Sequence, residues 1–127
     1  MENAKILHIE DNIYFIDVVK TSLNLDQQGH SVVEIANNME NARESLYRLA
    51  RNELDFNVVL LDGNLSSEST KGADAKRIIQ IIKELKLELI TIGCSEDNLK
   101  INSVDVDFEL PKKDFGIDKL ITLINSI

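Results

Sequence analysis

The 127-residue sequence predicts an α/β protein with a doubly wound, five-stranded parallel sheet in a single domain, residues 1–127. Three observations support this class. Short apolar runs alternate with segments of helical periodicity along the whole chain. One run, Val58–Leu61, is apolar at every position, as in a strand covered by helices on both faces. No linker, repeat or low-complexity tract divides the chain.

The expected elements follow one another without interruption. Strands rich in apolar and β-branched residues are expected at residues 5–9, 30–36, 56–61, 87–93 and 104–110. Helices with apolar residues at helical spacing are expected at residues 13–23, 39–51, 73–85 and 116–127. The polar segment 95–102 has room for only one or two helical turns, so the helix between the fourth and fifth strands is expected to be shortened or nearly absent. Alternating strands and helices imply parallel units with right-handed crossovers, and 2-1-3-4-5 is a common order for a doubly wound sheet of five such strands.

The composition argues against several classes of partner. The formal net charge is −8, and no basic face for a nucleic acid or an anionic membrane is visible. The single cysteine, Cys94, cannot form an internal disulfide, which suits a reducing compartment. The first residues are too few and too polar for a signal peptide, and no apolar run approaches the ~18 residues of a membrane span. We therefore expect a cytoplasmic protein that binds neither nucleic acid nor membrane.

Carboxylates follow two of the expected strands at the point where each strand ends. Glu10 and Asp11 follow the first strand, and Asp62 follows the third. The carboxyl ends of parallel strands share one edge, and the first and third strands are neighbours in the order 2-1-3-4-5. The three side chains are therefore expected within a few ångströms of one another. Lys112 and Lys113 follow the fifth strand and are expected at the same edge.

Clustered carboxylates repel one another unless a cation neutralises them. Mg²⁺ is a hard ion that prefers carboxylate, carbonyl and water oxygens, so it fits this set of ligands. A lysine at the same edge can hold an anionic group on one of the carboxylates. This combination favours phosphoryl transfer to Asp62, with the metal ion and the lysine stabilising the phosphoryl oxygens.

In this order the motifs resemble the receiver domain of two-component response regulators over essentially the whole chain. The resemblance rests on Glu10-Asp11 after KILHI, on Asp62 after VVLL, and on LPKK before the final amphipathic helix. It implies a flavodoxin-like fold, which agrees with the strand order above. It also implies a single-domain response regulator rather than an enzyme. Such a protein accepts a phosphoryl group from a histidine kinase or a phosphotransfer protein and signals to a downstream protein by contact.

The resemblance implies a role for each residue of the site. Asp62 matches the phosphoacceptor, Asp11 a direct Mg²⁺ ligand, and Glu10 a ligand that acts through water. Asn64 would lend its backbone carbonyl to the metal ion and present its side chain to the phosphoryl group. Lys112 would pair with the phosphate.

Two segments depart from the family pattern. The loop after Asp62 lacks the usual proline and is about two residues longer than expected. Pro111 precedes Lys112, whereas the family has a proline after the lysine. This difference leaves Lys113 as an alternative partner of the phosphate, although Lys112 is favoured.

The hydroxyl that the family carries after its fourth strand has no single match. Direct counting reaches Gly93, which has no hydroxyl. Ser95 is the preferred residue if the strand end bulges, and Thr91 is the alternative. Phe108, on the fifth strand, matches the position of the aromatic residue with which the family switches.

Three other functions are compatible with parts of this pattern. A receiver-like interaction module that does not switch by phosphorylation would explain the missing hydroxyl match, but not the complete set of acids and lysine. A hydrolase of the haloacid dehalogenase type would need a second aspartate where Asn64 stands. A flavin-binding flavodoxin would need a phosphate-binding loop after the first strand, where Glu10 and Asp11 would repel a phosphate.

Overall fold

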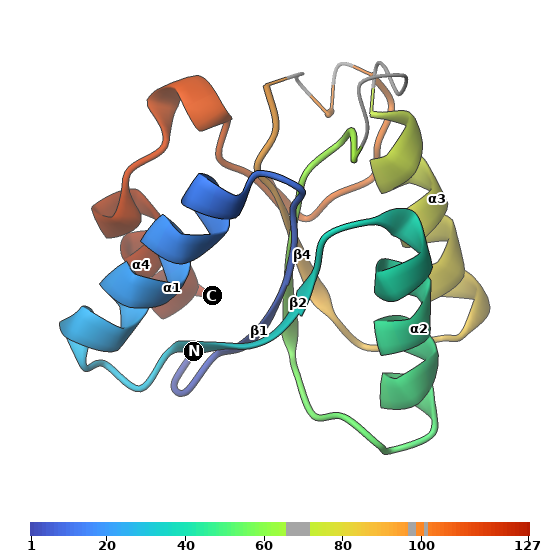
Figure 1. Ribbon diagram of the computed structural model, residues 1–127, viewed down its shortest axis with the longest axis horizontal. Coiled ribbons are helices and arrows are strands. Elements are labelled where there is room, and N and C mark those ends of the chain that lie inside the picture. The colour runs from blue at the N-terminus through green and yellow to red at the C-terminus, as the bar shows by residue number, and fades with distance from the viewer. Residues whose placement is uncertain (66–71, 97–98, 101) are drawn as a thin grey trace.

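The computed structural model describes residues 1–65, 72–96, 99–100 and 102–127. A parallel sheet lies between two layers of helices (Figure 1). The strands are β1 (Lys5–Ile9), β2 (Ser31–Ala36), β3 (Val58–Leu61), β4 (Ile90–Gly93) and β5 (Phe108–Glu109). The helices are α1 (Ile13–Asp26), α2 (Met39–Ala50), α3 (Ala73–Glu84) and α4 (Ile117–Ser126), with a short 3₁₀ helix, η1 (Lys112–Asp114), before α4.

The strand order is β2-β1-β3-β4-β5, and every neighbouring pair is parallel. The predicted doubly wound fold is therefore confirmed. In the pairing of β1 with β3, Ile9 lies opposite Leu61. The residues that follow the two strands, Glu10 and Asp62, consequently leave the sheet side by side.

Each face of the sheet has its own hydrophobic core. Helices α1 and α4 cover one face, and α2 and α3 cover the other (Figure 1). Alternate residues of a strand point to opposite faces, so β1 sends Ile6 to the α1/α4 side and Leu7 to the α2/α3 side. In β3, Leu60 and Leu61 are divided between the two cores in the same way. This double burial explains why the strand is apolar throughout.

Helix α1 begins directly after the acidic pair because Asn12 caps it. The Asn12 side chain accepts a hydrogen bond from the Phe15 N–H at 3.1 Å, which satisfies a donor that has no partner within the helix. The chain therefore turns sharply after Asp11. Glu10 and Asp11 stay at the sheet edge, and the first turn of α1 lies beside them.

The fifth strand is shorter than the sequence pattern predicts. Only Phe108 and Glu109 form β5, instead of residues 104–110. The Thr91 N–H donates to the side chain of Asp107 at 2.8 Å rather than to a backbone carbonyl. The Asp107 side chain therefore replaces a backbone acceptor in the pairing of β4 with the chain before β5. The buried Val104 and Val106 account for the alternating pattern, but they belong to a loop that covers the α2/α3 side of the sheet.

The described residues between β4 and β5, numbered 94–96, 99–100 and 102–107, form no helix. Residues 97, 98 and 101 of this connection lie outside the described residues, as do residues 66–71 of the lengthened loop after Asp62. Among the helices in the described ranges, none combines the length and apolar character that a membrane crossing requires.

The central position of β3 leads to a stability prediction. Leu60 is 0% exposed, so Leu60→Ala should leave a cavity and lower the free energy of unfolding by about 2–5 kcal/mol. Val33→Ala is the control, because Val33 lies exposed on the edge strand β2 and should cost less than about 1 kcal/mol. Urea unfolding followed by circular dichroism measures both. Equal losses would mean that β3 is not the centre of the core.

Candidate functional site

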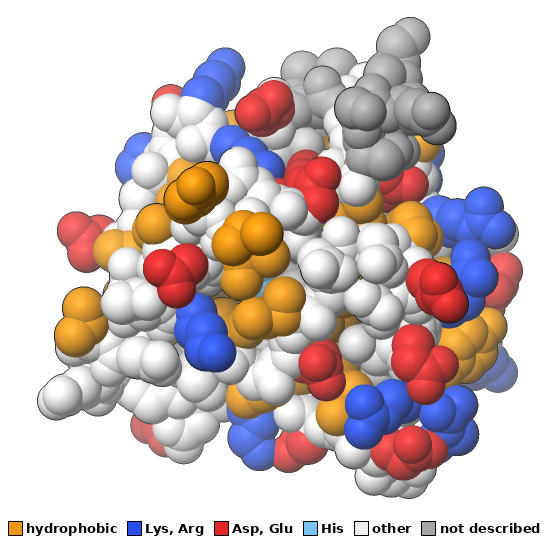
Figure 2. Space-filling view, viewed as in Figure 1, with side chains coloured by type: hydrophobic (Ala, Val, Ile, Leu, Met, Phe, Trp, Pro, Cys, Tyr) orange, Lys and Arg blue, Asp and Glu red, His pale blue; other side chains and the backbone are white. Residues whose placement is uncertain are grey.

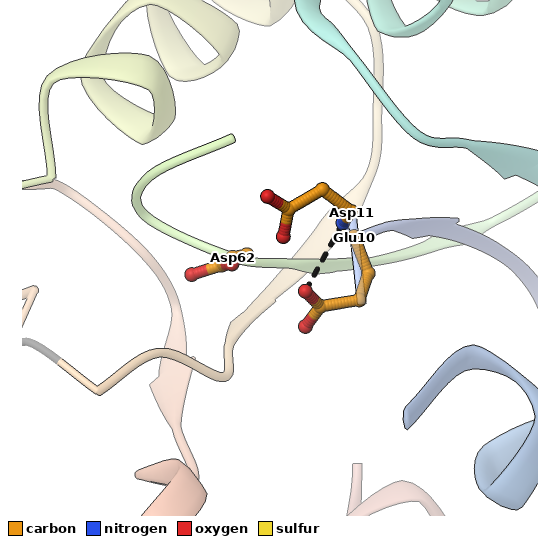
Figure 3. A group of neighbouring side chains, drawn as sticks. All are labelled: Glu10, Asp11 and Asp62. Atoms are coloured by element: carbon orange, nitrogen blue, oxygen red, sulfur yellow. Dashed lines mark hydrogen bonds between the residues drawn. The ribbon is translucent and has the colours of Figure 1, made fainter. Parts of the chain in front are cut away.

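The three predicted carboxylates meet at the carboxyl edge of the sheet (Figure 3). Glu10, Asp11 and Asp62 each offer an oxygen within 4.8 Å of the others. Backbone hydrogen bonds hold the two strand ends in place. The Glu10 N–H donates to Ala36 O and the Asp62 N–H to Ile9 O, both at 3.0 Å. Glu10 and Asp62 are buried and Asp11 is exposed, so the cluster opens to solvent on the Asp11 side.

Lys112 contacts two of these carboxylates. Its Nζ lies 2.8 Å from Glu10 Oε1 and 3.4 Å from Asp62 Oδ2. The Lys112 N–H donates to the Ser95 carbonyl at 3.1 Å, which ties the start of η1 to the chain beyond β4. Lys113 is exposed and forms no ion pair with any residue in the described part of the chain. Of the two lysines, Lys112 is therefore the one that reaches the carboxylates.

The Glu10 carboxylate uses its two oxygens differently. Oε2 accepts hydrogen bonds from the N–H groups of Asp11 and Asn12, both at 3.1 Å (Figure 3 shows the first). Oε1 is buried and, apart from its ion pair with Lys112, has no hydrogen-bond partner among the residues described. A buried carboxylate oxygen with spare acceptor capacity fits a ligand that acts on a cation through water.

The site holds more negative than positive charge. Burial raises the pKa of Glu10 to about 7, with the Lys112 contact acting against the shift and the charge of Asp62 adding to it. Burial works to lower the pKa of Lys112, but its contacts with Glu10 and Asp62 outweigh burial and raise that pKa. Lys112 is therefore a permanent cation. With all three carboxylates ionised, two negative charges remain, which is the charge that a divalent cation neutralises.

The chain after Asp62 is held against the start of α3. The Asn64 N–H donates to Asp62 Oδ1 at 3.3 Å, and Asn64 Oδ1 accepts from the Gly72 N–H at 3.1 Å. The Leu65 N–H donates to the Asp74 carboxylate at 2.6 Å. The side-chain oxygen of Asn64 thus bridges the two ends of the loop, while its backbone stays beside Asp62.

The structure separates the candidates for the hydroxyl at the end of β4. The Thr91 hydroxyl donates to Asp107 Oδ2 at 3.1 Å and accepts from the Asp107 N–H at 2.9 Å, so it belongs to the contact between β4 and the start of β5. Gly93 is the last residue of β4. Ser95 is buried, and its Oγ would lie 3.0 Å from a Cβ placed on Gly63, the residue after Asp62. Ser95 is therefore the hydroxyl that lies next to the Asp62 loop.

Aromatic residues around Lys112 were not expected from the sequence. The ammonium group of Lys112 lies 5.2 Å from the ring centroid of Phe15, a cation–π distance. Phe15 makes edge-to-face contacts with His8 and Phe115, at centroid distances of 5.7 and 4.9 Å. No sequence signal connects Phe15 to a lysine far along the chain.

Phe108, the predicted switching aromatic, is half-buried. It pairs with Ile92 of β4 and packs against the core on the α1/α4 side. It lies on the strand that leads to Lys112.

Comparison with known proteins bears on the fold. No protein-family model and no curated protein matches the sequence. Solved structures match over nearly the whole chain. A DNA-binding response regulator of the LuxR family from Staphylococcus aureus has a TM-score of 0.74 at 17% identity, with 97% of each chain covered. The signal receiver domain of NarL from Mycobacterium tuberculosis also has a TM-score of 0.74, at 15% identity, with 99% of this chain and 96% of that chain covered.

A response regulator from Burkholderia pseudomallei has a TM-score of 0.68 at 16% identity, covering 94% of this chain and 65% of that chain. Its structure holds a phosphorylated aspartic acid, a calcium ion and citrate. The chain has the fold of a response-regulator receiver domain. Its acidic cluster lies at the edge where this fold, like other doubly wound sheets, places ligands.

The raised pKa of Glu10 predicts how the metal-free receiver fold responds to pH. Between pH 4.5 and about 7 the folded chain keeps a proton that the unfolded chain has released, so the Glu10 contribution to stability falls as the pH rises. Glu10→Gln cannot titrate and should show a weaker decline. Urea unfolding with a chelator, at about pH 5 and about pH 8, measures the difference.

Glu88→Gln is the matched control, because it removes an exposed carboxylate in the loop before β4. It should leave the pH dependence of the wild type unchanged. An identical decline in Glu10→Gln and the wild type would contradict a raised pKa at Glu10.

Proposed function

We propose that the protein is a response-regulator receiver that accepts a phosphoryl group on Asp62 from a phosphohistidine of a histidine kinase or phosphotransfer protein. The observation that carries this proposal is that Lys112 contacts both Asp62 and Glu10 of the acidic cluster. With all three carboxylates of the cluster ionised, two negative charges remain for a divalent cation to neutralise. The role of the protein is to receive and pass on a signal, and it needs no substrate of its own beyond the phosphodonor.

The residues of the chain account for the transfer as follows. An oxygen of Asp62 attacks phosphorus, and the bond from phosphorus to the donor imidazole nitrogen breaks as the new bond to oxygen forms. Lys112, which pairs with Asp62 before transfer, moves its ion pair to a phosphoryl oxygen. The Asn64 N–H, already 3.3 Å from Asp62 Oδ1, is a further donor at the same place. The Ser95 hydroxyl lies close enough to the loop to become a third.

A divalent cation, Mg²⁺ in the cell, would offset the charge of the carboxylates and of the incoming phosphoryl group. The residues fit such an ion. Asp11 offers its carboxylate at the open side, and the Asp62 oxygens keep acceptor capacity beyond their contacts with Lys112 and the Asn64 N–H. The backbone carbonyl of Asn64 follows close along the chain, and Glu10 Oε1 has capacity for a water. All of these are hard oxygen ligands, which favours Mg²⁺ over softer metals.

The surface beside the acidic edge supports a protein as the phosphodonor. Ile13 and Tyr14, in the first turn of α1, are 75% and 85% exposed, and Val18 is exposed one turn later. Figure 2 shows hydrophobic side chains gathered over the surface that α1 forms. Large exposed apolar side chains next to a reactive group mark a contact surface for another protein.

The first prediction for this function concerns the metal ion. Asp11→Asn removes the exposed carboxylate of the cluster and should abolish Mg²⁺ binding, without lowering the stability of the metal-free protein. Asp17→Asn makes the same chemical change on the exposed side of α1 and should bind Mg²⁺ like the wild type. Calorimetric titration with Mg²⁺ measures both. Unchanged affinity in Asp11→Asn would show that the ion binds elsewhere.

The second prediction concerns Asp62. Acetyl phosphate with Mg²⁺ should add one phosphoryl group to the wild type and to Asp17→Asn, and none to Asp62→Asn, as read by intact mass. The adduct is an acyl phosphate, so hydroxylamine should remove it. A wild-type protein that gains no mass would favour a receiver-fold interaction module that does not switch by phosphorylation. A mass gain that persists in Asp62→Asn would move the acceptor to another residue.

A further inference from the structure

Leu99 is fully buried although it lies in the irregular connection between β4 and β5. It belongs to the hydrophobic core on the α2/α3 side, together with Val104 and Val106 of the same connection. This part of the core is therefore covered by side chains from a loop. Leu99 Cδ2 is also the nearest of the atoms that a Cβ on Gly63, the residue after Asp62, would meet.

Three glycines surround the end of the Leu99 side chain. A Cβ placed on Gly63 would lie 2.5 Å from Leu99 Cδ2, and one on Gly72 would lie 3.0 Å from the same atom. A Cβ on Gly93 would lie 2.7 Å from Leu99 Cδ1. Real Cβ atoms essentially never approach other atoms to less than 3.0 Å. Leu99 therefore occupies the volume that side chains at these positions would need, and we call Gly63, Gly72 and Gly93 the Leu99 socket.

The Leu99 socket joins three segments that carry the site. Gly63 directly follows Asp62, Gly72 precedes α3, and Gly93 ends β4. The Ser95 Oγ is also a neighbour of Gly63, because it would lie 3.0 Å from a Cβ there. The Leu99 N–H donates to Glu109 Oε1 of β5 at 2.6 Å, which anchors the loop on the strand that leads to Lys112.

This packing limits how the site can move. Interiors are close-packed, so Leu99 cannot shift without moving the glycine backbones that contact it, and Ser95 is only four residues away along the chain. Leu99 Cδ2 and Ser95 Oγ both lie against Gly63, so a shift of Leu99 would change the space between the Ser95 hydroxyl and the Asp62 loop. A smaller side chain would leave both segments free to separate.

We propose that Leu99 is a positioning residue, which by filling the Leu99 socket holds Ser95 and the Gly63 backbone at the distance that determines the rate of gain and loss of a phosphoryl group on Asp62. This proposal rests on the phosphoacceptor function proposed above. Leu99 itself touches no reacting atom, and it acts by aligning Ser95 with the backbone that follows Asp62.

A steric test of the socket needs no phosphorylation. Gly63 has no positive φ, so Gly63→Ala tests side-chain crowding without backbone strain, whereas Gly72 has a φ of 75° and would add strain. Gly63→Ala should lower the melting temperature. Leu99→Ala removes the closest clash, at 2.5 Å, and leaves the wider contacts with Ser95 Oγ and Gly72 Cα, so the double variant should lose less than the sum of the two single losses. Additive losses in the double variant would mean that the two residues are not in contact.

The functional test compares leucines of equal burial. Leu99→Val keeps a buried apolar side chain but lacks the Cδ atoms that contact the glycines. Leu46→Ala removes a fully buried leucine of α2 from the same core and serves as the control for lost packing. With acetyl phosphate and Mg²⁺, Leu99→Val and Leu99→Ala should change the phosphorylation rate or the adduct lifetime by about tenfold, since small misplacements of reacting groups have effects of this size. Leu46→Ala should leave both within about twofold of the wild type.

The outcomes separate the two proposals. A phosphorylated wild type with equal kinetics in the Leu99 and Leu46 variants would overturn the positioning role and leave the function of Asp62 intact. A Leu99 effect that vanishes in the background of Ser95→Ala would support alignment through Ser95. A wild type that is never phosphorylated would overturn the proposed function and the positioning role together, while the melting temperatures would still decide whether Leu99 fills the socket.

Discussion

A single ammonium group balances two buried carboxylates that come from different strands. Lys112 lies 2.8 Å from Glu10 and 3.4 Å from Asp62, and its side chain is only 17% exposed. Removing one partner from such a group would leave a buried charge without compensation, which is strongly destabilising. The ends of β1, β3 and β5 are therefore tied electrostatically at the same point. The aromatic contact with Phe15 extends this link to α1.

Side chains two positions apart on a strand point to the same face of the sheet, and this alternation brings titratable side chains together on one side. Glu10 follows His8 on β1 by two positions, and Asp62 follows Leu60 on β3 in the same way. Burial, helped by the charge of Lys112, lowers the pKa of His8 to about 4, and burial raises the pKa of Cys94 to about 12. Both groups are therefore neutral at physiological pH. Neither group therefore adds a charge to the acidic cluster and Lys112 at this edge.

The connection between β4 and β5 shows how a loop can cover a core that a helix would otherwise cover. Three of its described residues, Leu99, Val104 and Val106, belong to the core on the α2/α3 side. They do not follow helical or strand spacing as a group. Glycines at the ends of three elements make room for Leu99. The pairing of Thr91 with the Asp107 side chain begins the last strand late and lengthens this loop. Residues close to Asp62 thus take their positions from packing rather than from regular secondary structure.

Regular periodicity was enough to predict the layers, the strand order and the convergence of Glu10, Asp11 and Asp62, because these follow from local patterns and from the handedness of crossovers. The short β5 was not readable in this way. The preference for Lys112 over Lys113 and for Ser95 came from the family resemblance, and periodicity gave no sign of the contacts that hold them. Each depends on a contact between residues far apart in the chain: Asp107 with Thr91, Lys112 with Glu10, and Leu99 with Gly63. Such contacts leave no period in the sequence, since their distances arise only when the packed elements bring the side chains together.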